Sequence, residues 1–287
     1  MLMGYLLMTI CDVGHGNCIP VMMPSSQNGS KTALLDCGGD ENADEAAKYL
    51  KALKVTKLDY LVISHPHLDH IRNIVSLKRD FSPTILARNR IITEQKIKDE
   101  NAEVFETHEK IIQTYVDMDK SYSDPVNPPD DPKIPEWGGG AYFVNFFNSD
   151  IDMNLNNLSL ASFIVYGEHV ILHSGDLEEQ GWKKLLENSS FLDMLKKTTV
   201  FIASHHGRES GYCADVFNYL KPMITIVSDG RFGDTSATSR YISITKGMQI
   251  TKNDRSQEKR YVVSTRNDGH IYVIITDGTD LTVKISK

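Results

Sequence analysis

Residues 58–70 read LDYLVISHPHLDH, an apolar run that ends in three histidines and an aspartate. The run from Leu58 to Ser64 is short and bounded by a proline, which is typical of a β-strand buried on both faces. The HxHxDH pattern that follows consists of His65, His67, Asp69 and His70. Imidazole nitrogens and carboxylate oxygens are common ligands of divalent metals such as Zn²⁺, and also suit Mn²⁺. The stretch therefore predicts a metal site at the C-terminal end of a buried strand.

Two other apolar runs end in side chains of the same kind. Asp176 comes shortly after the run Val170–Leu172, and His205 and His206 come directly after Thr199–Ala203. The His-x-His pair can bind one ion, the Asp-His pair can reach a second, and Asp176 can bridge them. Two ions about 3.5–4 Å apart clamp the oxygens of a displacement and lower the pKa of a bound water. A histidine cluster without metal, a single-ion site, and a metal site without turnover remain as alternatives.

The elements predicted around these motifs alternate between strand and helix, which favours the α/β class. Strands are expected over residues 8–13, 18–23, 32–36, 142–147, 160–166 and 224–228, and helices near 43–53, 94–120, 178–187 and 213–220. The tail predicts a hairpin of strands 261–264 and 271–276. Five of the ten prolines lie between Pro125 and Pro135, followed by three glycines, so residues 121–140 predict a surface loop. We expect a single domain, 1–287, with this loop between its halves.

Composition and charge exclude several classes of protein. The chain has 287 residues, 40% hydrophobic and 24% charged, which is not fibrous or disordered. A net charge of −7 excludes general polyanion binding through bulk charge. The four cysteines form no CxxC pair, which favours reduced thiols and a cytoplasmic location. The apolar N-terminus is too short for a membrane span and lacks signal-peptide features, so we expect no membrane contact.

Six motifs in this order resemble the metallo-β-lactamase superfamily, and most closely the hydrolase domain of ComEC-type DNA-uptake proteins and their free-standing relatives. The motifs are DVGHGN at 12–17, LLDCGG at 34–39, HPHLDH at 65–70, NNLSL at 156–160, SGDLE at 174–178 and HHG at 205–207. The resemblance extends from about residue 8 to residue 276. It implies an αββα sandwich, with two mixed β-sheets between helices and the site at one edge.

The resemblance also implies a role for each motif residue. The implied metal ligands are His65 and His67 on the first ion, Asp69, His70 and His205 on the second, and Asp176 bridging the two. Asp36 would orient a ligand histidine and fix its tautomer. Asp69 would also hold the nucleophilic water, and His206 would donate to an anionic substrate or leaving group.

Three substrate-binding residues are expected near these motifs. Arg72 stands where the family has small glycines after HxHxDH, which puts it near the mouth of the site. Asn157 belongs to the asparagine motif and would contact an open coordination position. His15 lies between Gly14 and Gly16, where backbone N–H groups could face an anion, although a tight strand turn explains the same pattern.

Residues 231–266 contain eight basic and three acidic residues in a chain of negative net charge. This asymmetry favours a phosphate-binding flank that includes Lys259 and Arg260. A solvated loop is the alternative interpretation.

We therefore expect a metal-dependent hydrolase that uses two Zn²⁺ or Mn²⁺ ions to activate water against a phosphodiester in nucleic acid or a nucleotide. The phosphorus preference follows from the resemblance, because the spacing of the ligands indicates only metal-assisted hydrolysis. One alternative is a hydrolase of a small ester, lactone or phosphocholine-type substrate. Another is a non-catalytic, metal-bearing regulatory subunit. By analogy with free-standing relatives, a protein partner in a bacterial defence complex is also conceivable.

Overall fold

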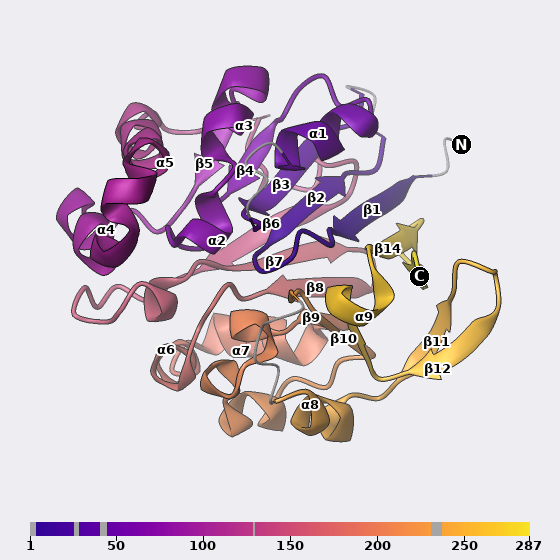
Figure 1. Ribbon diagram of the computed structural model, residues 1–287. Helices are drawn as coiled ribbons and strands as arrows, with labels where there is room; N and C mark the ends of the chain where they lie inside the picture. The colour runs from indigo at the N-terminus through magenta and orange to yellow at the C-terminus, as the bar shows by residue number, and fades with distance from the viewer. Residues whose placement is uncertain (1–3, 26–28, 41–44, 129, 231–236) are drawn as a thin grey trace.

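Two β-sheets pack face to face, and helices cover the outer face of each sheet (Figure 1). The computed structural model describes residues 4–25, 29–40, 45–128, 130–230 and 237–287. The arrangement is the αββα sandwich of mixed sheets expected from the sequence. In the part of the chain that the structure describes, no helix is long and apolar enough to cross a membrane.

The larger sheet has nine strands in the order β12-β11-β15-β14-β1-β2-β3-β4-β5. Its strands are β1 (Tyr5–Ile10), β2 (Cys18–Met22), β3 (Thr32–Cys37), β4 (Tyr60–Val62), β5 (Ile85–Ala87), β11 (Met248–Thr251), β12 (Gln257–Arg260), β14 (Ile271–Thr276) and β15 (Asp280–Ile285). Strands β3, β4 and β5 run parallel. Their carboxyl ends therefore point to the same edge of the sheet.

The smaller sheet has six strands in the order β13-β10-β9-β8-β7-β6. Its strands are β6 (Tyr142–Phe146), β7 (Ala161–Tyr166), β8 (His169–His173), β9 (Val200–Ile202), β10 (Ile224–Val227) and β13 (Val262–Ser264). Strands β8, β9, β10 and β13 run parallel, whereas β6 and β7 are antiparallel additions.

Helices cover the larger sheet on one side and the smaller sheet on the other (Figure 1). Those beside the larger sheet are α1 (Glu45–Ala52), α2 (Leu68–Ile71), α3 (Ile74–Phe81), α4 (Glu94–Glu100) and α5 (Ala102–Ser121). Those beside the smaller sheet are α6 (Glu179–Leu185), α7 (Ser189–Lys197) and α8 (Thr238–Ile244). Short turns are α9 (Thr265–Asp268) and the 3₁₀ turns η1 (Asn156–Leu158), η2 (Ser204–Gly207), η3 (Glu209–Gly211) and η4 (Ala214–Asn218).

The apolar side chains form three layers that match this architecture. A central cluster joins the facing sides of the two sheets, with Met8 and Val273 from one sheet and Ile171 and Ile226 from the other. A second cluster lies between the larger sheet and α1–α5. A third lies between the smaller sheet and α6–α8. Because each sheet is covered on both faces, every residue of central strands such as β3 and β8 is buried.

The hairpin predicted for the tail is wrong. Strand β13 pairs with β10 in the smaller sheet, whereas β14 pairs with β1 in the larger sheet. The chain crosses between the sheets through α9 and Gly269, whose φ is +71°. The antiparallel partner of β14 is β15, which the sequence analysis did not predict.

Two other segments differ from expectation. The predicted helix at 94–120 is two helices, because Asn101 has a non-helical backbone conformation that interrupts the helix. The Pro/Gly-rich segment contains no helix or strand in its described part, yet Trp137 is 3% exposed and packs edge-on against Tyr60. Trp137 therefore attaches this loop to the core between the sheets.

Candidate metal centre

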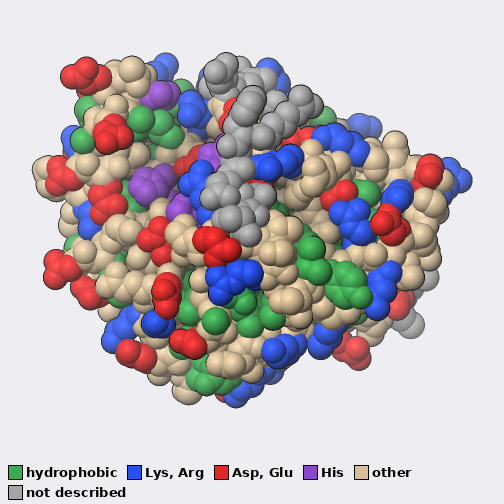
Figure 2. Space-filling model, turned by 60° about the horizontal axis from the view of Figure 1, so that its bottom comes forward, with side chains coloured by type: hydrophobic (Ala, Val, Ile, Leu, Met, Phe, Trp, Pro, Cys, Tyr) green, Lys and Arg blue, Asp and Glu red, His purple; other side chains and the backbone are tan. Residues whose placement is uncertain are grey.

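The candidate site lies where the carboxyl ends of β3, β4, β8 and β9 meet. Asp36 is the penultimate residue of β3, residues 65–70 follow β4, Asp176 follows β8, and His206 follows β9. Parallel strands place their C-terminal loops at one edge, which is where open α/β folds bind ligands. Figure 2 shows histidine side chains gathered on one face of the molecule, with Lys and Arg side chains beside them.

Four side chains form a compact group at this edge. Asp69, His70, Asp176 and His206 each offer one ligand atom, and these atoms all lie within 4.8 Å of one another. We call them the four-residue group. Nε2 of His70 lies 3.2 Å from Oδ1 of Asp176 and 3.9 Å from Oδ2 of Asp69. Nε2 of His206 lies 3.2 Å from Oδ2 of Asp69 and 3.5 Å from Oδ2 of Asp176.

A second pair of nitrogens lies next to this group. Nε2 of His65 and Nδ1 of His67 are 3.0 Å apart, so the HxH motif presents two nitrogens to one point. The ring of His65 lies 4.1 Å from the ring of His70, centroid to centroid. The His-x-His and Asp-His pairs are therefore adjacent, as the spacing of the motif predicted.

Asp36 supports the centre from its buried side. Its carboxylate is fully buried and accepts hydrogen bonds from the backbone N–H of Ser64 at 2.7 Å and the Ser64 hydroxyl at 2.8 Å. Nδ1 of His70 lies 2.8 Å from Oδ2 of Asp36, and Nε2 of His173 lies 3.2 Å away. A proton on Nδ1 of His70 leaves its Nε2 free for a metal ion. The structure thus places Asp36 behind the candidate ligand His70, in the position that the resemblance implied.

The asparagine motif supports the centre without facing it. Oδ1 of Asn157 accepts hydrogen bonds from the backbone N–H of Glu178 at 3.1 Å and of Gly181 at 2.7 Å. The hydroxyl of Ser159 accepts from the backbone N–H of Asp176 at 3.1 Å and lies 3.2 Å from Nδ1 of His65. Asn157 therefore positions the loop before α6 and is not brought to the four-residue group. Ser159 contacts the candidate ligand His65, a role that the sequence analysis did not assign.

The turn η2 decides which of its two histidines points inward. His205 and His206 have φ values of +50° and +55°, a left-handed conformation that residues other than glycine rarely adopt. His206 is 1% exposed, and its Nδ1 lies 2.8 Å from the backbone carbonyl of Ser228. His205 is half-buried: its Nδ1 contacts the Ser210 hydroxyl at 2.8 Å, and its Nε2 lies 3.8 Å from Oδ2 of Asp176. The structure therefore brings His206 into the group, in the position that the resemblance gave to His205.

Three half-buried residues surround the opening of the centre, and we call them the rim: His15, His205 and Arg208. Nε2 of His15 lies 3.3 Å from Oδ2 of Asp69, so this predicted residue does reach the site. The guanidinium of Arg208 contacts Nε2 of His205 at 3.2 Å and Nε2 of His15 at 3.4 Å. The sequence analysis missed Arg208, although it directly follows the HHG motif.

The electrostatics of the group favour a bound cation. Burial would raise the pKa of Asp176, but His206 and His70 outweigh it and hold that pKa well below its ordinary value. The pKa of Asp69 is likewise well below its ordinary value, because His70, His15 and His206 outweigh its burial. Both carboxylates are therefore ionised at neutral pH. Asp176 is buried and Asp69 is half-buried, and an ionised carboxylate in such a place needs positive charge beside it, from histidines or from a metal ion.

Two buried atoms test whether a metal ion fits the group. Nε2 of His70 and Oδ1 of Asp176 have no hydrogen-bond partner among the described residues, although they lie 3.2 Å apart. Buried polar atoms in proteins are almost always hydrogen-bonded, so each such atom needs an explanation. An imidazole nitrogen and a carboxylate oxygen aimed at one point are suitable ligands for Zn²⁺ or Mn²⁺. The donor set fits the metal that the fold implies.

Other predicted substrate residues lie outside the four-residue group. Arg72 contacts Nε2 of His108 at 3.3 Å, at a kink in α5. Lys259 and Arg260 lie on β12, the outermost strand of the larger sheet (Figure 1), and Arg260 pairs with Asp268 at 3.3 Å. The first residues of the basic flank, 231–236, lie outside the described residues.

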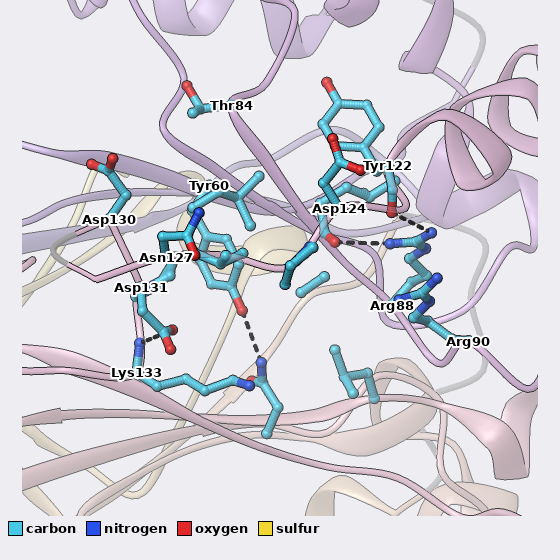
Figure 3. A pocket seen from close by; sticks show the side chains of 18 of the residues that line it. Tyr60, Thr84, Arg88, Arg90, Tyr122, Asp124, Asn127, Asp130, Asp131 and Lys133 are labelled. Carbon is cyan, nitrogen blue, oxygen red and sulfur yellow. Dashed lines mark hydrogen bonds between the residues drawn. The ribbon is translucent and has the colours of Figure 1, made fainter.

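A separate cavity of about 680 Å³ lies at the free edges of both sheets, beside β5, β6 and the Pro-rich loop (Figure 3). Tyr60, Arg88, Arg90 and Lys133 are among its lining residues. Arg88 is paired with Asp119 at 2.6 Å. None of the candidate metal ligands lines this cavity, so it is distinct from the centre.

The chain is similar to known proteins in sequence and in fold. The sequence matches the family described as Metallo-beta-lactamase superfamily over residues 26–207, more than half of the chain. No curated protein matches the sequence of this chain. A metallo hydrolase from the archaeon Ignicoccus hospitalis is similar at 12% identity and a TM-score of 0.48, covering 93% of this chain and 98% of that chain. The metallo-beta-lactamase fold protein YhfI from Bacillus subtilis is similar at 17% identity and a TM-score of 0.42, covering 82% and 91%.

Proposed function

The chain belongs to the metallo-β-lactamase superfamily, and on this premise we propose that it hydrolyses phosphodiester bonds in nucleic acid or nucleotides at a centre of two Zn²⁺ or Mn²⁺ ions. The observation that carries the proposal is the convergence of Asp69, His70, Asp176 and His206 within 4.8 Å. The preference for phosphorus rests on the six motifs that resemble ComEC-type hydrolases. We place the reaction in the cytoplasm, since the sequence favours reduced thiols.

The ligands divide into two adjacent sets. His65 and His67 would hold one ion through the two nitrogens that lie 3.0 Å apart. Asp69, His70 and His206 would hold the other, and Asp176 would bridge the sets. When bound, the ions supply a water of lowered pKa and stabilise negative charge on the reacting phosphate.

The chain itself orients these groups and controls protons at the centre. Asp36 keeps a proton on Nδ1 of His70, and the carbonyl of Ser228 keeps one on Nδ1 of His206, so that both Nε2 atoms face the centre. Asp69 presents its carboxylate to the centre between His15 and His206. That position suits it to hold and orient a water at the centre.

The proposal is tested on one purified sample. Metal content per chain is measured, and activity is then assayed with added Mn²⁺ or Zn²⁺ on DNA, RNA, bis-p-nitrophenyl phosphate and a lactone. We expect about two ions per chain and cleavage of the phosphodiesters. Cleavage of the lactone alone would replace the proposal with a small-ester hydrolase. Bound metal without any turnover would replace it with a metal-bearing regulatory subunit, and His67→Ala serves as the inactive control.

A further inference from the structure

Arg208 stands at the rim of the metal centre without a carboxylate partner. Its guanidinium contacts only two imidazole nitrogens, Nε2 of His205 at 3.2 Å and Nε2 of His15 at 3.4 Å. Among the described residues, no carboxylate oxygen lies within salt-bridge distance of it. In the described part of the chain, Arg208 therefore forms contacts with imidazoles but no ion pair.

Three other arginines of the fold are paired with carboxylates. Arg266 contacts Oδ2 of Asp229 at 2.6 Å, and Arg88 contacts Asp119 at 2.6 Å. Arg240, on α8, pairs with Glu209 at 2.6 Å. A half-buried arginine that lacks such a pair beside a cation site is electrostatically costly, since metal ions at the four-residue group repel it. An anion between the ions and the guanidinium removes this repulsion.

We infer that Arg208 binds an anionic oxygen of the substrate phosphate and so determines specificity for phosphodiesters over neutral esters. The inference rests on the proposed function and deepens it. A planar guanidinium can donate two parallel hydrogen bonds to a phosphate, and it keeps its charge at every working pH. Its backbone is fixed for this purpose, because the N–H of Arg208 donates to the carbonyl of His205 at 3.0 Å and its own carbonyl accepts from Gly211 at 3.1 Å.

A merely structural role for Arg208 predicts a different result. If the guanidinium only tied His205 to His15, its loss would disturb the turn η2 and with it His206. Metal content and hydrolysis of every substrate would then fall together. An anion-binding role instead affects anionic ligands alone and leaves metal content unchanged.

The test compares Arg208→Gln and Arg208→Lys with a matched control, Arg90→Gln. Arg90 is an exposed arginine at the separate cavity, so its variant removes one positive charge away from the centre (Figure 3). The measurements on metal-loaded protein are KM and kcat for bis-p-nitrophenyl phosphate, hydrolysis of p-nitrophenyl acetate, binding of inorganic phosphate by calorimetry, and metal content.

For Arg208→Gln we expect KM for the phosphodiester and the dissociation constant of phosphate to rise about 10- to 100-fold. Arg208→Lys should lie between this variant and the natural protein, and Arg90→Gln should match the natural protein. Metal content and any acetate hydrolysis should stay unchanged. An Arg208→Gln variant that binds phosphate as tightly as the natural protein, or that loses metal, overturns the inference. A natural protein that holds metal but cleaves no phosphodiester defeats the proposed function instead, and its phosphate binding still decides the role of Arg208.

Discussion

Nε2 of His206 lies 3.2 Å from Oδ2 of Asp69, a residue 137 positions earlier in the chain. The neighbouring His205 contacts Arg208 and Ser210, and its Nε2 lies farther from the group, 3.8 Å from Oδ2 of Asp176. Two consecutive histidines offer the same chemistry in a sequence, so only the folded turn decides which one lies inside. Here the contact between Nδ1 of His206 and the backbone carbonyl of Ser228, at 2.8 Å, holds His206 in the buried position.

This relationship predicts unequal effects of the two histidines on metal binding. His206→Ala should remove one ligand of the four-residue group, so we expect the loss of about one ion per chain and of nearly all hydrolysis. His205→Ala should keep its metal, because its Nε2 is 3.8 Å from the nearest carboxylate oxygen of the group, Oδ2 of Asp176. Elemental analysis after dialysis measures the metal content of both variants. His169→Ala is the control, because His169 is a buried histidine remote from the centre. The reverse order of metal loss would restore His205 as the ligand.

Asp36 should control metal affinity without touching the metal. Asp36→Asn keeps the shape of the side chain but replaces one acceptor oxygen by an amide that cannot accept from His70. We expect metal affinity to fall about 10- to 100-fold, as measured by competition with a chelator. The metal-free variant should also lose about 3 kcal/mol of unfolding free energy, since a buried network is broken.

Asp59→Asn is the matched control for Asp36. Asp59 is also buried, and it accepts a hydrogen bond from the backbone N–H of Thr32 at 3.0 Å, but it lies at the opposite end of β4. This variant should lose stability and keep its metal affinity. Equal metal loss in both variants would show that Asp36 acts only through global stability.

Metal binding should release protons near neutral pH. Burial alone would lower the pKa of His70, but Asp176, Asp36 and Asp69 outweigh it and raise that pKa well above its ordinary value. Asp176 and Asp69 likewise raise the pKa of His206 against the effect of its burial. The metal-free folded protein therefore holds protons on these imidazoles above pH 6.5, and a metal ion must displace them.

The direction of the pH effect follows from those shifts. Raised pKa values stabilise the metal-free fold most below about pH 6.5, and this contribution is lost as the pH rises through the folded pKa values. Apparent Mn²⁺ affinity should consequently increase with pH over the same range. Calorimetry in two buffers of different ionisation enthalpy measures the protons released. Identical heats in both buffers would contradict the expectation.

The sequence was sufficient for the parts of the site that lie within one motif. HxHxDH after a buried strand predicted the adjacent nitrogen pair of His65 and His67 and the group around Asp69, because neighbours along a short loop stay neighbours in space. It was insufficient where the chain turns sharply, as at His205 and His206, since local backbone conformation does not follow from residue type. Lys259 and Arg260 were grouped by charge alone, and their role in substrate binding stays a prediction. Their strand pairs at the far edge of the larger sheet, a long-range contact that no local pattern encodes.

Gly38 should be indispensable, because it lets the metal-binding loop approach β3. A Cβ atom at Gly38 would lie 1.5 Å from the backbone carbonyl oxygen of Asp69, closer than any non-bonded contact. That carbonyl already accepts from the N–H of Asn17 at 3.1 Å, so the loop cannot simply withdraw without losing this hydrogen bond. Gly38→Ala must displace Asp69 from the four-residue group or shift β3. We expect a loss of about 3 kcal/mol or more of unfolding free energy, together with weaker metal binding.

Gly29→Ala separates this steric effect from the general cost of replacing glycine. A Cβ at Gly29 would meet no atom of the described residues within 4 Å, although its φ of +88° disfavours alanine. This variant should lose only about 1–2 kcal/mol of unfolding free energy and should bind metal normally. Urea denaturation of both metal-free variants, followed by metal titration, gives the comparison. If Gly38→Ala bound metal as tightly as Gly29→Ala, the close packing of β3 against the loop would not be what holds Asp69 in place.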